Sequence, residues 1–510
     1  QVNMQCICLN FLICKAQQDI MPQQPPVVQM PQRKVTTLFG NPKLSKKTKE
    51  EADEKFLKLF YIDFQLFSIV EEAGFKEFID VLNPAYELPN RHSISKTSIP
   101  ALFEACLVKS KELVARGSKF CITTDCWTSL NATNFLAVTA HFLTQNFEFY
   151  SVLLECCATK YSHTSENLAE DLKRVSEEWA IDNKIIIAVS DNAANIKNAI
   201  AVKLKWKFFH FGCFAHTLNL IVKSGLQNSE TLAIINKVKE IVTHFKKSYT
   251  ANEKLRQYQR NYLQDAIKST VALIDKPLPI LSPGEKYCTA SMVIPLVNGL
   301  QEVYIGLLAE SFSENIKLMV LQFLNGLKER LGAVQNSNSL LYATFLDPRF
   351  KNVAIVDKCA ADHAKKMVTS AVAALFYSDS PDQESSVKNI MERTTPVQLS
   401  VWSSFDSLVA KSKPVGTVNS KAIIEVQRYL EDTISPRNTD PFNWWQINMY
   451  KYPKLAQVAQ EKLCALASSV PCERLFSKAG QVLNERRSGL GEEKLKMLLF
   501  LNNNNKYVNK

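Results

Sequence analysis

The only long apolar run near the start of the sequence, Cys6 to Cys14, is too short to cross a lipid bilayer. It has about half of the ~20 residues that a transmembrane helix needs. It also lacks the basic flank and the cleavage site of a secretory signal. We therefore expect no membrane partner.

Zinc-ligand spacing is also missing near the N-terminus. No pair of cysteines is followed there by a pair of histidines, and Cys6, Cys8 and Cys14 do not supply such a site. The 13 cysteines are odd in number and scattered, which indicates reduced thiols in an intracellular compartment rather than a disulfide framework. Because residue 1 is Gln, we expect a fragment or a conceptual translation, with Met21 as an alternative start.

The bulk composition is that of a soluble globular protein with two or three domains. The 510 residues are 46% hydrophobic and 22% charged, so the chain can bury a large core. The formal charge of +11 favours approach to a polyanion such as DNA. We expect no small-molecule substrate.

Changes in composition and periodicity divide the chain into five parts. Residues 1–50 are rich in Gln and Pro and then in Lys, which predicts a disordered arm. Its lysines fit either a nuclear-import signal or a solvated charge run, and we expect a nuclear protein. The remaining parts are an N-terminal helical region at 51–116, the first part of a sheet domain at 117–228, a helical insertion at 229–440, and a region at 441–510 that completes the sheet domain.

Strand and helix signals in residues 117–228 follow the order of an RNase H-like sheet. Strands are predicted at 119–125, 134–143, 147–156, 184–190 and 208–213, with helices before and after the fourth. In that topology the first and fourth strands are parallel neighbours. We predict an α/β fold in which this mixed sheet is interrupted by a large all-helical insertion, with helices at 229–247, 296–331, 361–377 and 420–432.

Two aspartates stand at the carboxyl ends of these neighbouring strands. Asp125 follows an apolar strand, and Asp191 follows another 66 residues later (191 − 125). Ligands gather beyond the carboxyl ends of parallel strands, and two carboxylates forced together favour a shared proton or a bound cation. Hard oxygen ligands with few imidazoles nearby suit Mg²⁺ or Mn²⁺. The alternative is that both aspartates cap the helices that follow them.

A third carboxylate, Glu473, is predicted in the first turn of a helix that begins at Pro471. It would complete a three-carboxylate site. The alternative is that it complements the positive end of the helix dipole.

Seven stretches of the chain resemble transposases of the hAT superfamily, particularly the animal lineage related to BED-finger proteins. In order along the sequence they are FQLFSIVEEAGFKEFIDVLNPAYELPNRHSISKTSIP, TTDCWTS, SDNAANIKNAI, CFAHTLNLIV, EKYCTASMVIPLVNGL, FLDPRFK and VPCERLFSKAGQVLNERRSGL. None would suffice alone, but together they follow the family's order over most of the chain.

The resemblance implies an RNase H-like core with a helical insertion and a DDE triad of Asp125, Asp191 and Glu473, which would be both the catalytic and the metal-binding residues. Catalysis would follow the two-metal pattern with Mg²⁺ or Mn²⁺, one ion activating water or a 3′-hydroxyl and the other stabilising the leaving oxygen. Family members cleave DNA at element ends through hairpin intermediates and join the ends to a target, so the implied partner is DNA.

The resemblance also assigns the C-terminal segment to dimerisation, which implies a homodimer or a higher oligomer. Two arginines, Arg486 and Arg487, are candidate phosphate contacts, although an exposed arginine pair is ordinary. The candidate dimerisation residues, which would equally suit a core, are Leu475, Leu490, Leu495, Leu498 and Leu499.

Cys213 and His216 match the family's CxxH motif. With His210 they offer three potential zinc ligands, but a closed structural site needs a fourth. We therefore interpret the pair as groups that pack and position residues beside the active site.

Two departures from the family limit the expected function. No BED finger is visible, and the family's Thr-Arg-Trp-Asn-Ser-like segment is missing, since no tryptophan occurs between Lys237 and Leu281. That tryptophan can stack on a flipped base. We therefore expect a hAT transposase-derived protein that binds DNA and dimerises, whose metal site could cleave DNA strands without full transposition. The alternative is a catalytically inactive nuclear interaction or regulatory module, so whether the chain is an enzyme stays open.

Overall fold

The computed structural model describes residues 44–129, 133–159, 162–203, 209–227, 229–262, 289–378, 417–482 and 491–507. The chain divides into two compact units. The described part of the first unit comprises residues 44–52 and 72–88, and that of the second comprises 53–71 and the described residues from 89 onward. The second unit contains the sheet and every predicted site residue that the structure describes.

The N-terminal helical region is helical as predicted. Its elements are α2 (Lys46–Tyr61), η1 (Phe67–Glu71), α3 (Ala73–Leu82), α4 (Arg91–Ser93), η2 (Ile94–Ser98) and α5 (Ile99–Ala115). Within the first unit, α3 buries no residue and exposes Phe78, Val81 and Leu82. Within the second unit, α5 buries Ile99, Phe103 and Leu113.

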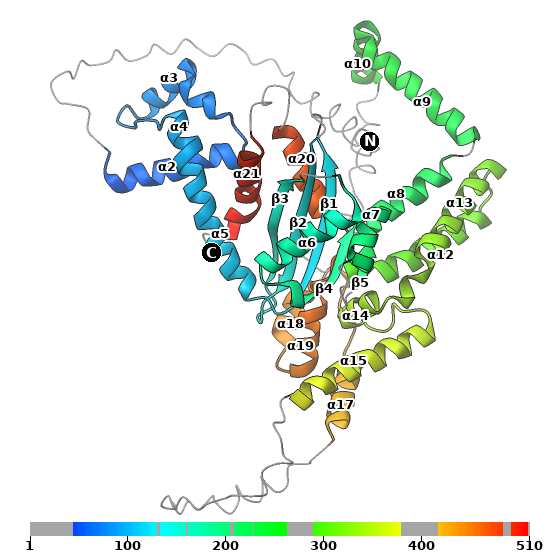
Figure 1. Ribbon diagram of the computed structural model, residues 1–510. Helices are drawn as coiled ribbons and strands as arrows, with labels where there is room; N and C mark the ends of the chain where they lie inside the picture. Colours follow the sequence, from blue (N-terminus) through cyan, green and yellow to red (C-terminus); the bar gives the residue numbers. More distant parts are fainter. Residues whose placement is uncertain are drawn as a thin grey trace, which may run out of the picture. The chain divides into compact units, whose positions relative to one another are not determined.

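A five-stranded mixed sheet lies at the centre of the second unit and confirms the predicted fold class (Figure 1). Its strands are β1 (Phe120–Thr128), β2 (Asn134–Leu143), β3 (Phe149–Ala158), β4 (Ile185–Ser190) and β5 (Phe209–Gly212), in the order β3-β2-β1-β4-β5. β1 pairs antiparallel with β2 and parallel with β4, and β5 continues the parallel side. The long apolar runs of these strands are buried on both faces.

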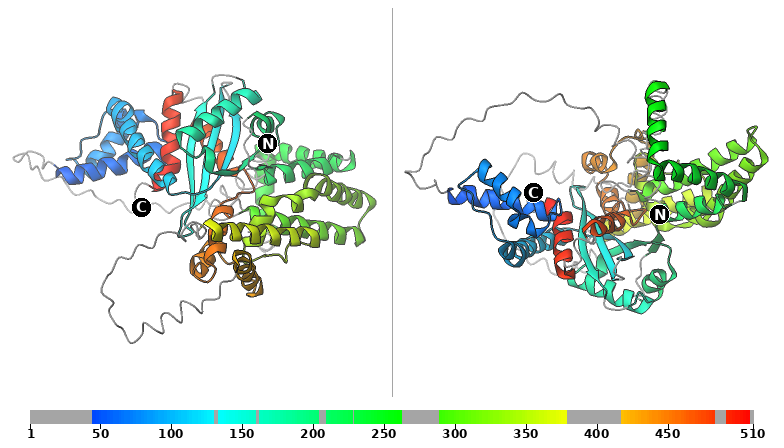
Figure 2. Two further views of the ribbon diagram at one scale, coloured as in Figure 1. Left: turned by 60° about the horizontal axis from the view of Figure 1, so that its bottom comes forward. Right: turned by 90° about the horizontal axis from the view of Figure 1, so that it is seen from above.

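Helices cover both faces of the sheet (Figure 2). The helical elements around the sheet are α6 (Ser165–Glu178), η3 (Asp182–Lys184), α7 (Ala194–Asn198), η4 (Ala199–Lys203), α8 (Phe214–Gly225), α20 (Val470–Val482), α21 (Glu492–Asn504) and η8 (Asn505–Tyr507). Of these, α8 packs mainly on residues 314–331 of the helical domain, and η8 contacts the edge of β3. α20 packs on β1 and β2, and α21 packs on β3.

The outer edge of β3 is paired by side chains. The Asn504 amide accepts from Leu153 N (2.9 Å) and donates to Leu153 O (2.8 Å), while Tyr507 Oη bonds the backbone of Ser151. Exposed sheet edges invite pairing with other chains. The C-terminal helix therefore closes an edge that would otherwise be open.

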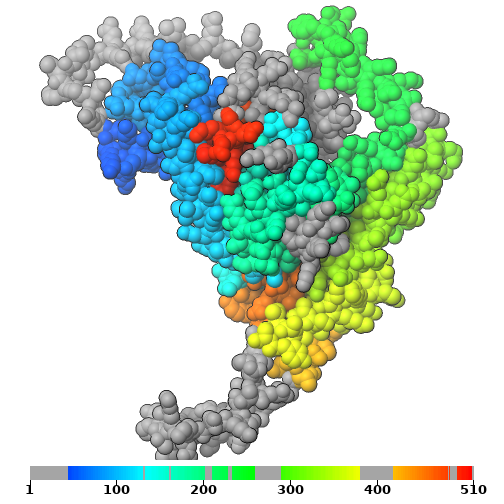
Figure 3. All heavy atoms as spheres, in the orientation of Figure 1, coloured from blue at the N-terminus to red at the C-terminus, as the bar shows by residue number. Residues whose placement is uncertain are grey.

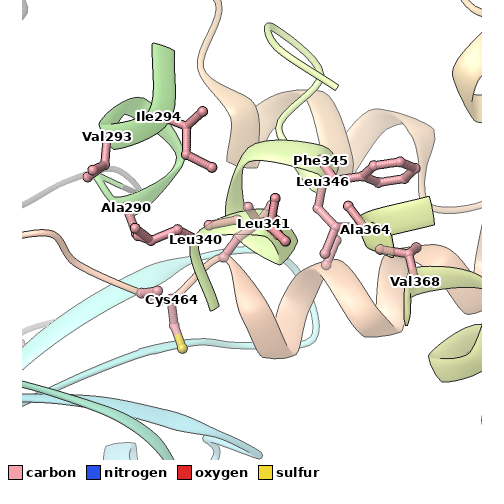
Figure 4. Packing of buried hydrophobic residues seen from close by; sticks show 14 of the residues in the cluster. Ala290, Val293, Ile294, Leu340, Leu341, Phe345, Leu346, Ala364, Val368 and Cys464 are labelled. Atoms are coloured by element: carbon pink, nitrogen blue, oxygen red, sulfur yellow. The ribbon is translucent and has the colours of Figure 1, made fainter. Parts of the chain in front are cut away.

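The insertion is helical, and most of its helices pack around one apolar cluster (Figure 4). Its elements are α9 (Ser229–Lys247), α10 (Tyr249–Tyr262), η5 (Ala290–Met292), α12 (Val293–Ala309), α13 (Glu314–Leu331), η6 (Gly332–Asn336), α14 (Asn338–Leu346), α15 (Lys358–Ser378), α17 (Val418–Glu431), α18 (Pro441–Asn448) and α19 (Pro453–Lys462). The sheet shares this cluster through residues such as Ile187 and Val189, whereas the described side chains of α9 and α10 contribute nothing to it. α18 and α19 share this cluster with α14 and α15, so the helical packing continues past residue 440.

The predicted helix at 296–331 is two helices, α12 and α13. The chain turns extended at Glu310, and Ser313 precedes the second helix. The break is a tight turn in which Phe312 N donates to Glu310 O at 2.9 Å, and the Ser313 side chain makes no capping bond.

Among the described residues, one helical stretch, Ala290–Ala309, is long and apolar enough to cross a membrane by length and composition. Ala290, Val293 and Ile294 of this stretch pack into the apolar cluster of the helical domain.

Candidate active site

Asp125 and Asp191 lie at the same register of two neighbouring parallel strands. β1 and β4 pair Ile122 with Ala188 and Thr123 with Val189, an offset of 66 residues, and the two aspartates are separated by the same offset (191 − 125). Asp191 directly follows β4. Both aspartates therefore stand together beyond the hydrogen-bonded part of this strand pair, where ligands collect in such sheets.

Glu473 reaches the same face of the sheet through α20. The Cys472 thiol lies 3.4 Å from both Thr123 O and Thr123 Oγ1. Four residues later, the Phe476 ring stacks on Trp127, with centroids 5.8 Å apart and 24° between the planes. Thr123, Asp125 and Trp127 alternate to one face of β1. Asp125 therefore lies on β1 between Thr123 and Trp127, the two residues that α20 contacts through Cys472 and Phe476.

The pKa values of Asp125 and Glu473 are both raised at this place in the sheet. Burial, and then repulsion from Asp191 and Glu473, raise the pKa of Asp125 to about 7, although the Cys126 amide donates to its Oδ1 at 2.9 Å. Glu473 is exposed as a whole residue, but the protein around its carboxylate removes part of the water there. This desolvation, and less strongly Asp191, raise the pKa of Glu473, while His216 opposes the shift. Such mutual repulsion is relieved by a bound cation or a retained proton.

The chemistry of these donors suits a divalent cation of the Mg²⁺ type, because all three side chains offer carboxylate oxygens. The three carboxylates lie farther apart than the ligands of a metal site with its ion bound. Within the part of the chain that the structure describes, no group of three His, Cys, Asp or Glu side chains is close enough to hold one ion. The donor set therefore fits the cation in kind and in charge, and ligation would require the carboxylates to move together.

The capping alternative does not describe the two aspartates. Asp125 lies inside β1, which continues to Thr128. α7 begins at Ala194 after Ala193, whose side chain cannot cap it, and Asp191 instead accepts from Ala193 N at 3.2 Å. Glu473 does occupy the first turn of α20, so its helix-dipole role is compatible with the structure.

The CxxH motif starts α8. Cys213 is buried and precedes the helix; its thiol accepts from His216 N at 3.5 Å, and its amide donates to Ser190 O at 2.6 Å. His210 Nε2 lies 2.8 Å from Ser190 Oγ. The Cys213 amide and the His210 ring thus contact Ser190, the residue before Asp191. That the CxxH pair positions groups beside the site stays a prediction.

Asn192 and Thr217 support the Asp191 loop and were not singled out in the sequence. Asn192 Nδ2 donates to Thr217 Oγ1 at 2.8 Å, which ties the loop to α8. Gly212 permits this approach, since a Cβ there would lie 2.1 Å from Asn192 Oδ1. Asn192 is part of the stretch SDNAAN, but its partner lies 25 residues away and no local pattern points to it.

Substitution of Gly212 by alanine is expected to lower the free energy of unfolding by about 1–3 kcal/mol, because the added Cβ would displace Asn192. Chemical denaturation would measure this loss, and faster amide hydrogen exchange at residues 190–198 would locate it. Gly299→Ala is the matched control. Its Cβ meets nothing within 4 Å in α12, so it should stabilise the protein by up to about 1 kcal/mol. Equal effects of the two changes would contradict the role of Gly212.

A buried polar cluster lies beside the site. His141 Nε2 is 2.9 Å from Thr139 Oγ1 and 3.3 Å from Thr123 Oγ1, and Thr123 also contacts Cys472. His141 Nδ1 has no hydrogen-bond partner within the described structure. Burial lowers the pKa of His141 to about 3, and Lys506 adds to this shift.

The remaining predicted residues are either buried in the core or lie outside the described residues. Arg486, Arg487 and Leu490 lie in 483–490, outside the described residues. The other four leucines are buried within this subunit, which favours the core alternative that the sequence left open. They are Leu475, Leu495, Leu498 and Leu499.

Three family models match successive parts of the chain. The ZBED1 RNase-like domain matches residues 123–211, the ZBED1 RNase-like helical domain matches 211–275, and the hAT family C-terminal dimerisation region matches 425–505. The first two matches meet at residue 211, within β5, where the sheet gives way to α8 and the helical domain.

Full-length comparison gives distant relatives over most of the chain. Human zinc finger BED domain-containing protein 4 is 23% identical over 87% of this chain and 42% of the relative. A candidate AC transposase of Zea mays is 23% identical over 85% of this chain and 62% of the relative. Human zinc finger BED domain-containing protein 6 is 22% identical over 94% of this chain and 57% of the relative. The chain thus spans about half the length of these curated relatives.

Proposed function

Because the chain is a hAT-family, ZBED-like protein with an RNase-like domain and a hAT C-terminal dimerisation region, we propose that it is a transposase-derived nuclear protein that binds DNA, self-associates and cleaves DNA strands. The observation that carries the proposed cleavage is the common register of Asp125 and Asp191, with Glu473 brought to the same face by α20. Full transposition is not part of the proposal, since the segment with the base-stacking tryptophan is missing.

Asp125, Asp191 and Glu473 would hold the divalent cation. A bound Mg²⁺ or Mn²⁺ would supply activation of water or of a 3′-hydroxyl and stabilisation of the leaving oxygen. The chain's own contribution is positional: Cys472 and Phe476 fix the first turns of α20 on β1, and the Ser190 and Asn192 contacts fix the loop of Asp191. DNA binding is supported by the formal charge of +11 and by the family relationship.

Nicking of supercoiled plasmid in Mn²⁺ tests the proposal. We expect the wild-type chain to nick DNA, and Asp125→Asn, Asp191→Asn and Glu473→Gln each to reduce the rate at least about 100-fold, because each removes one metal-binding charge. Glu170→Gln is the control, since this exposed carboxylate lies on α6 and should leave the rate unchanged. Equal nicking by the wild type and the triad variants would point to a contaminating nuclease.

A catalytically inactive interaction or regulatory module is the second candidate function. It is favoured by one observation: the described residues contain no assembled three-ligand group. A well-folded wild-type chain that binds DNA but does not nick it in Mn²⁺ would favour this function over the first.

A further inference from the structure

Three large apolar side chains stand exposed in the described part of residues 425–505, the stretch that matches the dimerisation region. Ile434 is 47% exposed, Ile447 is 68% exposed and Tyr450 is 87% exposed. The leucines that the sequence suggested as contact residues are buried instead. These three side chains are therefore the large apolar groups that the described part of this stretch offers to a partner.

Contacts around Asp432 bring the three residues to one place. Lys451, the neighbour of Tyr450, donates to both Asp432 carboxylate oxygens at 2.7 Å. Ile447 lies one helical turn before Tyr450, on the same side of α18 and the turn that follows it. Ile434 lies two residues beyond Asp432.

Val353 extends this surface from the loop after α14. The ammonium of Lys351 donates to Asp432 O at 2.6 Å, and Ser435 N donates to Pro348 O at 3.0 Å. These bonds bind the loop to the end of α17. Val353, two residues after Lys351, is 67% exposed. Figure 3 shows the orange and yellow segments of this part of the helical domain on the molecular surface.

We propose that Val353, Ile434, Ile447 and Tyr450 form the centre of an interface with the same surface of a second copy of the chain; we call this surface the α17–α18 surface. The inference rests on the proposed self-association and locates it. A two-fold dimer places one patch against itself, so a self-complementary apolar patch with polar surroundings suits it. Tyrosine is a frequent anchor at interface centres. The exposed Lys451–Asp432 ion pair would belong to the polar rim.

Sedimentation equilibrium of the full chain tests the proposal. We compare the wild type with the double variant Ile447→Asp and Tyr450→Asp. The dimer Kd should rise at least about 100-fold, because each dimer would bury four carboxylates near one another. Both side chains are exposed in the subunit, so the circular dichroism spectrum and Tm of the variant should match those of the wild type.

The matched control is the double variant Ile234→Asp and Val238→Asp on α9. These residues are also exposed and apolar but lie outside residues 425–505, so the control should dimerise as the wild type does. A monomeric α9 variant beside a dimeric α17–α18 variant would overturn the proposed location. A wild type that stays monomeric at all concentrations would overturn self-association itself.

A second measurement does not depend on charged substitutions. With p-benzoylphenylalanine in place of Tyr450, irradiation of the full chain should yield a covalent dimer joined between the two copies of this surface. Crosslinks confined to one subunit, in a sample shown to be dimeric, would place the interface elsewhere.

Discussion

Replacement of Asp347 by alanine is expected to destabilise the protein by about 3–5 kcal/mol, because it would leave the buried Arg349 guanidinium without its carboxylate partner. Asp347 is fully buried at the end of α14. Its carboxylate accepts from the Arg349 guanidinium at 2.9 and 2.6 Å and from Ser291 Oγ at 2.7 Å. Ser291 lies in η5, so the carboxylate also joins the start of α12 to the end of α14.

Urea unfolding followed by circular dichroism would measure this loss. Asp357→Ala is the control: Asp357 is exposed and accepts from backbone amides at the start of α15, so its loss should cost only about 1 kcal/mol. The double variant Asp347→Ala and Arg349→Met should be more stable than Asp347→Ala alone, since the stranded guanidinium is removed as well. A similar cost for Asp347→Ala and Asp357→Ala would show that the buried pair contributes little.

Acid is expected to destabilise the sheet domain through His141. The side chain is buried, and its pKa is about 3 in the folded protein against an ordinary value of 6.5. A lowered folded pKa means that the stabilising contribution is present above pH 6.5 and is lost as pH falls toward 3. The slope is about 1.4 kcal/mol per pH unit, so the loss at pH 4.5 should reach about 2–3 kcal/mol. Burial also lowers the pKa of His210, to about 4, which adds a loss in the same direction.

His141→Gln isolates the contribution of this residue, because the glutamine amide can replace Nε2 without taking up a proton. The free energy of unfolding should then fall less steeply between pH 6.5 and 4.5. His92→Gln is the control, since His92 is exposed on α4 and its replacement should leave the slope unchanged. Parallel pH profiles of the His141 variant and the wild type would exclude His141 as the group responsible.

The sheet could be predicted from the sequence because its strands are apolar runs of the right length and order. The meeting of Asp125 and Asp191 then followed from topology, since parallel neighbours bring their carboxyl ends together. The sequence predicted Glu473 in the first turn of a helix, but only the family resemblance grouped it with the two aspartates. It lies 282 residues after Asp191 (473 − 191), and no local pattern links the two. Its contact with β1 through Cys472 is visible only in the structure.

The sequence did not predict helix α14, which is buried on nearly every side. α14 buries Leu340, Leu341, Phe345 and Leu346, so its sequence has no polar face and no helical period. The Asp347 and Lys351 contacts were missed for a different reason. Their partners Ser291 and Tyr429 are 56 and 78 residues away, and the stretch FLDPRFK alone does not identify them.

The burial of the C-terminal leucines illustrates a limit of apolar patterning. Leu495, Leu498 and Leu499 follow the spacing of one helical face, and such spacing does not distinguish a core from an interface. In the structure this face packs on β3 and α5. The exposed Ile447 and Tyr450 lie where the sequence shows no such stripe.

The position of α20 has a consequence for synthesis of the chain on the ribosome. The five strands of the described sheet precede residue 213, but the helix that covers β1 and β2 begins only at Val470. At roughly 5–20 residues per second, the 282 residues between Asp191 and Glu473 take about 15–55 s to emerge. During that time the face that carries Thr123, Thr139 and His141 lacks its native cover. The nascent sheet would then be a substrate for chaperones until α20 has emerged.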